Sequence, residues 1–223
     1  MEKIDNLNEN EILMYLGYKG QEISPEVQSQ IDKCTNIVLS AAQPLATYKI
    51  LPLESDCKIS GTNLYLLGKD IKKHLENCSQ VVLFAATLGA QAEKAIMQAQ
   101  ITDMANAVIM DACASAAIEA VCNSEENKLR SKIEKSGKYL TDRFSPGYGD
   151  MPISQQRDFC AVIDSAKRIG LTVTKTNLLI PQKSVTAVMG ISDFPVKIRK
   201  KGCESCNMFK TCKFRKEGKN CGE

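Results

Sequence analysis

The chain has 223 residues, of which 43% are hydrophobic and 25% are charged, with a formal net charge of +3. This balance is typical of a soluble globular protein with one sizeable domain. No apolar run approaches the roughly 18–20 residues that span a bilayer, and the polar N-terminus lacks the apolar stretch of a secretion signal. These features argue against a membrane-spanning or secreted protein, so we expect a cytoplasmic one.

Positive charge is concentrated at the C-terminal end of the chain. Residues 196–223 carry nine Lys or Arg and three Glu, a net charge of +6, so the preceding residues have a net charge of −3. We therefore predict two parts, a folded domain at 1–195 and a basic, Cys-rich tail at 196–223.

The N-terminal region predicts two helices. A short helix covers 8–17. A longer one begins after Ser24, because Ser as N-cap followed by Pro25 is a typical helix start, and it continues to about Ala42. Its inward face is expected to carry the following apolar residues: Ile31, Ile37, Val38 and Ala41.

The middle of the chain predicts a mixture of strands and helices. Strands are expected at 46–52, 62–66 and 79–87, and the last of them is a continuous apolar run of buried-strand length. Helices are expected at 69–77, at about 90–100 and, as the longest and most alanine-rich, at about 103–135.

The C-terminal third predicts short elements. A strand at 139–143 is followed by a helix from Ser154 to Gly170 and by strands near 171–174 and 184–190. Because strands and helices do not alternate regularly, we expect the α+β class: a single domain with a mixed, mainly antiparallel sheet flanked by helices.

Familiar catalytic motifs are missing. The only histidine, His74, lies on a polar helix, where a solvated surface position is expected rather than a role as base or metal ligand. There is no phosphate-binding G-x-x-x-x-G-K-[ST] loop. The single glycine of Thr87-Leu-Gly-Ala is too weak a signal for a dinucleotide site.

One polar stripe interrupts the alanine-rich helix. Asp111, Ser115 and Glu119 recur every four residues and therefore share one face. The stripe is either an exposed helical face or, since its neighbours are small, a surface that a ligand or strand approaches closely.

The segment from Arg143 to Gly149 combines residue types suited to a ligand. Arg143 offers a planar set of donors for a carboxylate or phosphate. Pro146 favours an extended Ser145, and the two glycines allow close approach of the backbone. Alone, the segment is equally typical of a tight surface turn.

Several segments occur in an order that resembles a known family. Tyr15-Leu-Gly-Tyr-Lys-Gly-Gln-Glu, Asp111-Ala-Cys-Ala-Ser-Ala-Ala-Ile-Glu, Arg143-Phe-Ser-Pro-Gly-Tyr-Gly-Asp, Gly170-Leu-Thr-Val-Thr and Leu179-Ile-Pro-Gln-Lys-Ser-Val-Thr-Ala-Val-Met-Gly follow one another along the chain. Over roughly residues 8–195 the chain resembles the reactivation domain of cobalamin-dependent methionine synthase, and above all its stand-alone versions.

The resemblance implies a function. Domains of this family bind S-adenosylmethionine and dock over a corrinoid carried by a partner. With one electron from a low-potential donor, they support the reductive remethylation of cob(II)alamin. The expected partner is a corrinoid methyltransferase such as methionine synthase. Since positioning is the catalysis, the resemblance implies no catalytic acid or base in this chain.

The resemblance also implies roles for particular residues. Arg143 would bind the methionyl carboxylate, and Glu119 the ammonium or the ribose. Ser145 and Gly147 would offer backbone groups, and Tyr148 would lie near the sulfonium or the corrin. Two positions depart from the family pattern: Gly149-Asp150 replaces a proline after the tyrosine, and Ile191-Ser-Asp-Phe-Pro lacks a second tyrosine.

The tail carries four closely spaced cysteines: Cys203, Cys206, Cys212 and Cys221. In a cytosolic protein this density indicates a metal site rather than disulfides, and four thiolates fit either zinc or an iron–sulfur cluster. An alternative function follows, a redox or adaptor protein that binds a partner without S-adenosylmethionine. With only Phe209 and Phe214 available for stacking, nucleic-acid binding is not expected.

Overall fold

The protein is organised around a four-stranded antiparallel sheet with the strand order β1-β2-β6-β3. The structure, a computed structural model, describes residues 4, 7–18 and 21–196. The strands of the sheet are β1 (Leu45–Pro52), β2 (Cys78–Thr87), β3 (Tyr139–Leu140) and β6 (Ser184–Ser192). A separate two-stranded ladder joins β4 (Thr172–Val173) and β5 (Leu179–Ile180).

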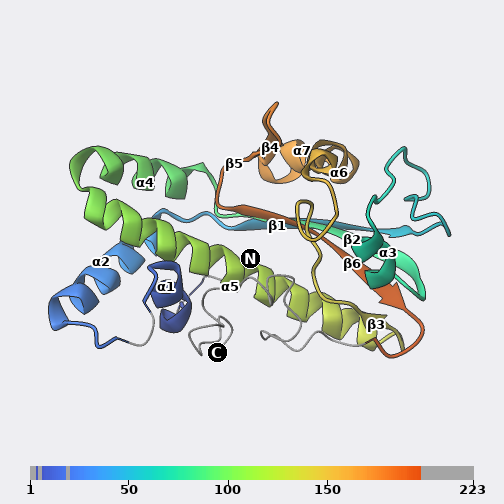
Figure 1. Ribbon diagram of the computed structural model, residues 1–223, viewed down its shortest axis with the longest axis horizontal. Helices are drawn as coiled ribbons and strands as arrows, with labels where there is room; N and C mark the ends of the chain where they lie inside the picture. The colour runs from blue at the N-terminus through green and yellow to red at the C-terminus, as the bar shows by residue number, and fades with distance from the viewer. Residues whose placement is uncertain (1–3, 5–6, 19–20, 197–223) are drawn as a thin grey trace.

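Helices cover both faces of this sheet. In the described part of the chain they are α1 (Glu9–Tyr15), α2 (Pro25–Ala41), α3 (Lys69–His74), α4 (Ala90–Thr102), α5 (Met104–Glu134), the single-turn η1 (Ile153–Gln155), α6 (Gln156–Ile163) and α7 (Ser165–Ile169). Figure 1 shows α5 crossing one side of the sheet while α6 and α7 lie on the other. This arrangement confirms the predicted α+β class.

Strand β2 shows why both faces are covered. Its alternate residues Val82, Phe84 and Ala86 belong to a core formed with α2, α4 and α5. The intervening Val81, Leu83 and Ala85 belong to a second core formed with α3, α6 and α7. Because successive side chains of a strand point to opposite faces, a continuous apolar run must be buried on both sides, as predicted for 79–87.

Helix α5 is the core helix of the domain. It has 31 residues, a length of about 46 Å, and it begins where the Asp103 side chain accepts a hydrogen bond from Asn106 N. Contrary to the expectation from the sequence, its most apolar stretch is long and apolar enough to cross a membrane, with a mean hydropathy of 1.4, but 61% of that stretch is buried inside the fold. Alanines on the buried face let α2 and α4 approach closely, so the apolar stretch belongs to the interior of the fold.

Most predicted elements are confirmed, including the helix that Ser24 caps through Val27 N and the strand at 46–52. The predicted strand at 62–66 is wrong, since only an isolated bridge between Lys58 and Tyr65 occurs there. The predicted inward position of Ile37 is also wrong: Ile37 is exposed, and Cys34 lies in the core instead. Apolar residues alone therefore did not define the inner face of this helix.

Two elements near the C-terminus are shorter than predicted. The strand at 139–143 is paired only at Tyr139 and Leu140, and a single bridge at Phe144 continues it. The helix from Ser154 to Gly170 divides at Asp164, whose φ of 58° is left-handed. This break separates α6 from α7, and both helices contact β1 and β2.

Gly190 lies where β6 crosses α3 with no space for a side chain. A Cβ at this position would meet the Cys78 Sγ and would lie 2.9 Å from Leu75 Cδ2. We expect Gly190→Ala to lower the free energy of unfolding by about 1–3 kcal/mol, as measured by urea denaturation. Cys78→Ala in the same chain removes the Sγ and should restore part of the loss, whereas an additive double variant would contradict this packing explanation.

Candidate functional site

Arg143 is held against helix α5 by three side chains. Its Nε donates to Glu126 Oε2 at 2.9 Å, and its Nη2 donates to Asn123 Oδ1 at 2.6 Å and to Glu119 Oε2 at 3.2 Å. Only 16% of the Arg143 side chain is exposed. Bonds to charged partners at these distances are among the stronger hydrogen bonds in proteins, so the guanidinium is fixed in one orientation.

The charge network extends to the end of α5. Glu126 Oε1 accepts from Arg130 Nη2 at 2.8 Å, and Arg130 Nη1 donates to the Leu140 carbonyl at 2.5 Å. Arg130 also lies 3.6 Å from Asp142 Oδ1. Two arginines and three carboxylates therefore tie the segment after α5 back onto that helix.

Part of this network is unused. Apart from the interaction of Arg143 with the Cys122 thiol, no described residue makes a hydrogen bond to the Nη1 of Arg143 or to the Oε1 of Glu119. The Tyr15 phenol, at the end of α1, belongs to the same surroundings: burial raises its pKa, and the negative charge of Glu119 adds to the rise. The site thus presents a free donor group beside a free acceptor, with an aromatic ring close to them.

The segment after Arg143 forms a compact loop. Phe144 is 1% exposed, and its ring centroid lies 5.3 Å from those of His74 and Tyr148. The loop closes through Tyr148 N, which donates to the Ser145 carbonyl at 3.0 Å, and through Gly147 N, which donates to the Met151 carbonyl at 3.0 Å. The N–H of Gly147 is therefore used inside the loop, while the ring of Tyr148 is 40% exposed.

Asp150, one of the two positions that depart from the family pattern, has a structural role. Its carboxylate accepts from Lys69 N at 2.6 Å and from Asp70 N at 3.0 Å, at the start of α3. The bonds from the Asp70 and Lys69 amides lower the pKa of Asp150. Gly149 allows this approach, because a Cβ there would lie 2.5 Å from Asp70 Oδ2. Asp150, which departs from the family pattern, thus holds the loop against the start of α3.

His74 is not the solvated surface residue that the sequence predicted. Its Nε2 lies 2.8 Å from the Asp142 carbonyl and 2.9 Å from Thr141 Oγ1, and its ring packs on Phe144. The periodicity of a short polar helix gave no signal for this contact, since the partners are about 68 residues away along the chain. The histidine positions the segment that carries Arg143.

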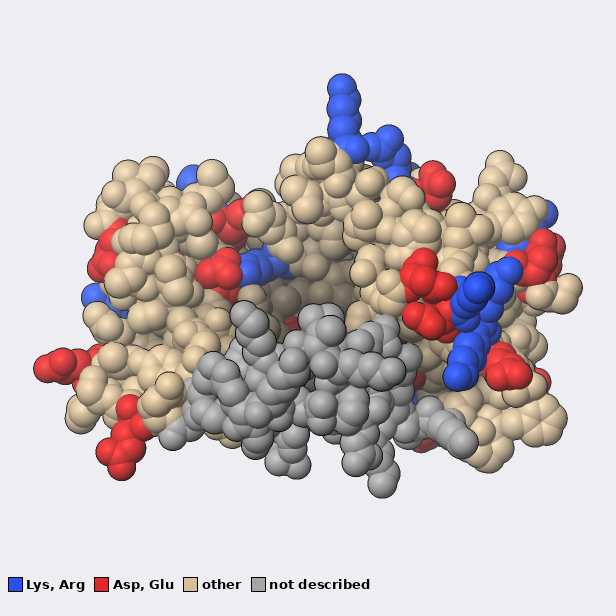
Figure 2. Space-filling model, viewed as in Figure 1, with Lys and Arg blue, Asp and Glu red and all other residues tan. Residues whose placement is uncertain are grey.

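The polar stripe of α5 pairs with two cations from outside the helix, although the Asp111 side chain is 57% exposed. Lys183 Nζ lies 2.8 Å from Asp111 Oδ1 and donates to Ser115 Oγ at 2.9 Å, whereas Glu119 pairs with Arg143. Figure 2 shows this face of the molecule hollowed at its centre, with basic and acidic atoms side by side at one wall. The stripe is therefore the face of α5 that meets Lys183 and Arg143.

Sequence reasoning missed several members of the site. Asn123 and Glu126 continue the spacing of Asp111, Ser115 and Glu119 along α5, so the pattern itself contained a signal for them. Lys183 and Tyr15 gave no such signal, because only the tertiary fold brings the start of β6 and the end of α1 to α5.

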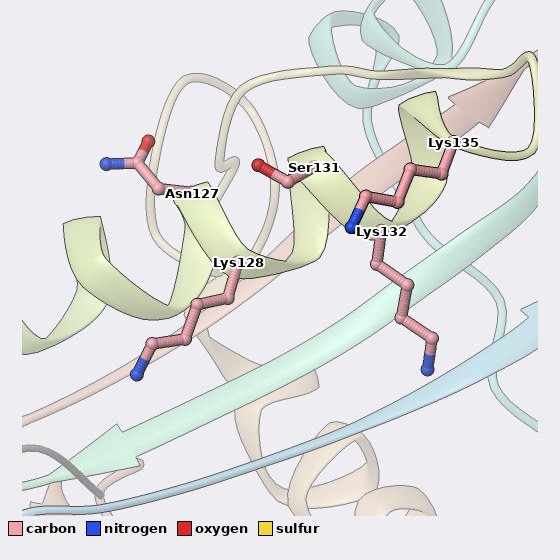
Figure 3. A pocket seen from close by; sticks show the side chains of 5 residues that line it. All are labelled: Asn127, Lys128, Ser131, Lys132 and Lys135. Atoms are coloured by element: carbon pink, nitrogen blue, oxygen red, sulfur yellow. The ribbon is translucent and has the colours of Figure 1, made fainter.

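A second depression lies on the outer side of α5. It has a volume of about 460 Å³ and is lined by Asn127, Lys128, Ser131, Lys132 and Lys135. Figure 3 shows the side chains of Lys128 and Lys132 pointing away from each other along the helix. Lys132 Nζ lies 5.8 Å from the centroid of the Tyr48 ring. No residue predicted for the site lines this depression.

The predicted metal ligands Cys203, Cys206, Cys212 and Cys221 lie outside the described residues. Within 4, 7–18 and 21–196, no group of three or more His, Cys, Asp or Glu side chains is arranged to hold a metal ion. The six cysteines of the described part are all free thiols.

Cys122 lies beneath the guanidinium of Arg143. Burial raises the pKa of the Cys122 thiol to about 12, although the neighbouring Arg143 acts in the opposite direction. Because alkylation requires the thiolate, we expect iodoacetamide at pH 8 to label Cys122 at least ~10-fold more slowly in native than in urea-unfolded protein, as followed by peptide mass spectrometry. Equal labelling rates in native and unfolded protein would contradict the buried position of the Cys122 thiol.

The fold and the site define an α+β domain in which a core helix and a sheet edge enclose a groove with a paired arginine and glutamate. A crystal structure of the MetH reactivation domain bound to AdoHcy has a similar fold, with a TM-score of 0.61 and 14% sequence identity over 82% of this chain and 73% of that one. No protein-family model matches the chain, and no curated protein sequence matches it. The similarity supports the predicted fold relationship.

Proposed function

We propose that this protein binds S-adenosylmethionine and supports the reductive remethylation of a corrinoid on a partner methyltransferase, for which methionine synthase is the best candidate. The observation that carries the proposal is the Arg143–Glu119 pair, 3.2 Å apart, with a free guanidinium nitrogen and a free carboxylate oxygen. The neighbour with the same fold was crystallised with AdoHcy, whose amino-acid part is a zwitterion.

The free groups of the pair match the two charges of such a zwitterion. The carboxylate of the ligand takes the remaining N–H groups of Arg143 Nη1, and the ammonium takes Glu119 Oε1. Since Glu126 and Asn123 already fix the guanidinium, little side-chain entropy is lost on binding. The site is thus organised before the ligand arrives.

Two aromatic rings suit the sulfonium. Tyr148 is exposed at the rim of the loop, and Tyr15 lies next to Glu119. A sulfonium is a cation, and cations are stabilised over aromatic faces by about 0.5–2 kcal/mol. The corrinoid, when brought by the partner, supplies the nucleophile for the methyl group, so this chain has only to bind and orient the donor. Acid–base residues are unnecessary for that task.

The proposal is tested by calorimetry with the full chain. We expect S-adenosylmethionine and S-adenosylhomocysteine to bind, and Glu119→Gln, which keeps the shape but removes the charge, to weaken both by about tenfold. Asp111→Asn lies on the same stripe of α5 but pairs with Lys183, so it serves as the matched control and should change affinity little.

Two results would contradict the proposal. Wild-type protein that binds neither compound would exclude the site and leave the predicted metal-dependent adaptor as the better explanation. Equal losses in Glu119→Gln and Asp111→Asn would show that the stripe, rather than the Arg143–Glu119 pair, determines affinity.

A further inference from the structure

Strand β1 lies at one edge of the sheet and pairs only with β2. Leu53, which directly follows the strand, donates inward to the Ser79 carbonyl of β2 at 3.0 Å, whereas the Pro52 carbonyl accepts from Ser60 N, also at 3.0 Å, on the outer side. Backbone groups of successive strand residues point to opposite edges. The even-numbered residues of β1 therefore direct their N–H and C=O groups outward.

The open section of this outer edge is short. Two prolines, Pro44 and Pro52, lie at its ends, and neither has an N–H to donate. Between them, each of Ala46, Tyr48 and Ile50 directs one N–H and one carbonyl outward. No described residue makes a hydrogen bond to these outward groups, and all three residues are at least partly accessible to solvent. The edge thus presents a row of backbone donors and acceptors to a strand from outside the fold.

Three cations flank the open section, on both faces of the sheet. On the α5 side, Lys132 Nζ lies 3.3 Å from the Tyr48 hydroxyl, and Figure 3 shows its side chain extending from α5 toward β1. On the other side, Arg168 Nη1 donates to Thr47 Oγ1 at 3.3 Å, and Lys49 Nζ donates to a carbonyl of α6 at 2.7 Å. None of the three cations forms an ion pair with a described carboxylate.

These charges determine which kind of segment the edge accepts. A second copy of this chain, paired through the same edge, would bring Lys49, Lys132 and Arg168 close to the same three cations of its partner. Like charges opposite each other in a strand pair are destabilising, and lysine on an edge strand is a common protection against self-pairing. Opposite charges in the same positions are stabilising, so the edge favours a segment that carries carboxylates.

We propose that the open edge of β1 binds an extended, acidic segment of a partner protein, which adds a strand to the sheet. Strand addition takes its affinity from main-chain hydrogen bonds and its specificity from side chains at alternate positions. About five residues of the partner span the section from Ala46 to Ile50. Carboxylates on one face of the added strand meet Lys132, and those on the other face meet Arg168 and Lys49.

This surface is separate from the groove at Arg143. Strand β3, which leads to Arg143, forms the opposite edge of the sheet, with β2 and β6 between it and β1. A partner can therefore occupy the edge of β1 whether or not the groove holds a ligand. The proposal goes beyond the proposed function and does not depend on it.

A synthetic peptide tests the proposal with the full chain. The probe is an acetylated and amidated heptapeptide of alternating Glu and Thr, and the analogue with Gln in place of Glu is the uncharged control. Repulsion between its carboxylates keeps the free probe extended. At low ionic strength we expect the Glu peptide to bind at least about tenfold more tightly than the Gln peptide, as measured by calorimetry.

Hydrogen exchange locates the bound peptide. At a peptide concentration about tenfold above its Kd, the amides of Ala46, Tyr48 and Ile50 should exchange about tenfold more slowly than without peptide. The amides of Thr47 and Lys49 point toward β2 and are already bonded there, so their exchange should not change. This alternation distinguishes an added strand from a peptide that binds elsewhere.

Two pairs of variants separate the backbone from the charges. Ile50→Pro removes one outward N–H and no hydrogen bond within the fold, so it should lower peptide affinity about tenfold, whereas Ile50→Thr keeps the N–H and should bind nearly normally. Lys132→Gln should lower the affinity about threefold. Lys138→Gln is its matched control, because Lys138 pairs with Asp193 beside β3, at the opposite edge of the sheet, and it should change the affinity little.

Three results would overturn the proposal. If the Glu peptide at about 10 mM leaves the three outward amides unprotected, the edge does not accept a strand. If the Gln peptide binds as tightly as the Glu peptide, the cations do not select the partner. If sedimentation equilibrium shows a dimer that Ile50→Pro dissociates, the occupant is a second copy of this chain. None of these results bears on S-adenosylmethionine, whose binding decides the proposed function separately.

Discussion

Arg143→Ala is expected to lower the affinity for S-adenosylhomocysteine about 100-fold, since it removes the charge-assisted bonds to the ligand carboxylate. It should also lower the free energy of unfolding by about 2 kcal/mol, because Glu119 and Glu126 lose their shared cation in a largely buried position. Calorimetry and urea denaturation on the same sample give both values. Arg143→Lys should restore part of the stability but little of the affinity, because an ammonium lacks the planar set of donors.

Arg130→Ala is the matched control for this result. Arg130 pairs with the same Glu126, at 2.8 Å, and also ties Leu140 to α5, but unlike Arg143 it does not pair with Glu119. We expect Arg130→Ala to lose about as much stability as Arg143→Ala but to lower the affinity for S-adenosylhomocysteine less than threefold. If Arg130→Ala loses as much affinity as Arg143→Ala, the arginine acts by holding the loop and not by touching the ligand.

Much of the fold could be predicted from the sequence, because local signals and packing agreed. Ser24 and Pro25 mark a helix start that capping chemistry determines, and the apolar run at 79–87 must be buried on both faces. Prediction failed where tertiary contacts override local preference. Residues 62–66 have strand-forming side chains but no neighbouring strand with which to form a ladder, and Asp164 divides a helix that its apolar spacing would continue.

The site was predictable only in part, for a related reason. Glu119 and Arg143 were each identified by residue type and spacing, but nothing in the sequence indicated that they pair, since 24 residues separate them.

Phe144→Ala is expected to have the largest effect on stability, a loss of about 3–4 kcal/mol in the free energy of unfolding. The ring is fully buried in the second core and lies edge-on to Tyr148 and against His74. Its removal leaves a cavity beneath the loop that carries Arg143 and Pro146. Because the loop is then no longer held by the Phe144 ring, the affinity for S-adenosylhomocysteine should fall as well. The apparent affinity falls with the fraction of molecules in which the loop keeps its native position.

Two further variants distinguish anchoring from direct contact. Phe144→Leu refills most of the cavity and should recover more than half of the lost stability and affinity together. Tyr148→Ala removes an exposed ring, so it should lower the free energy of unfolding by less than about 1 kcal/mol. If the phenol contacts the ligand near its sulfur, the same variant should still lower the affinity. An affinity that follows stability in all three variants would mean that the loop acts only as a support. A loss in Tyr148→Ala without loss of stability requires that the ligand touch the loop itself, which is the arrangement the groove between α5 and β6 implies.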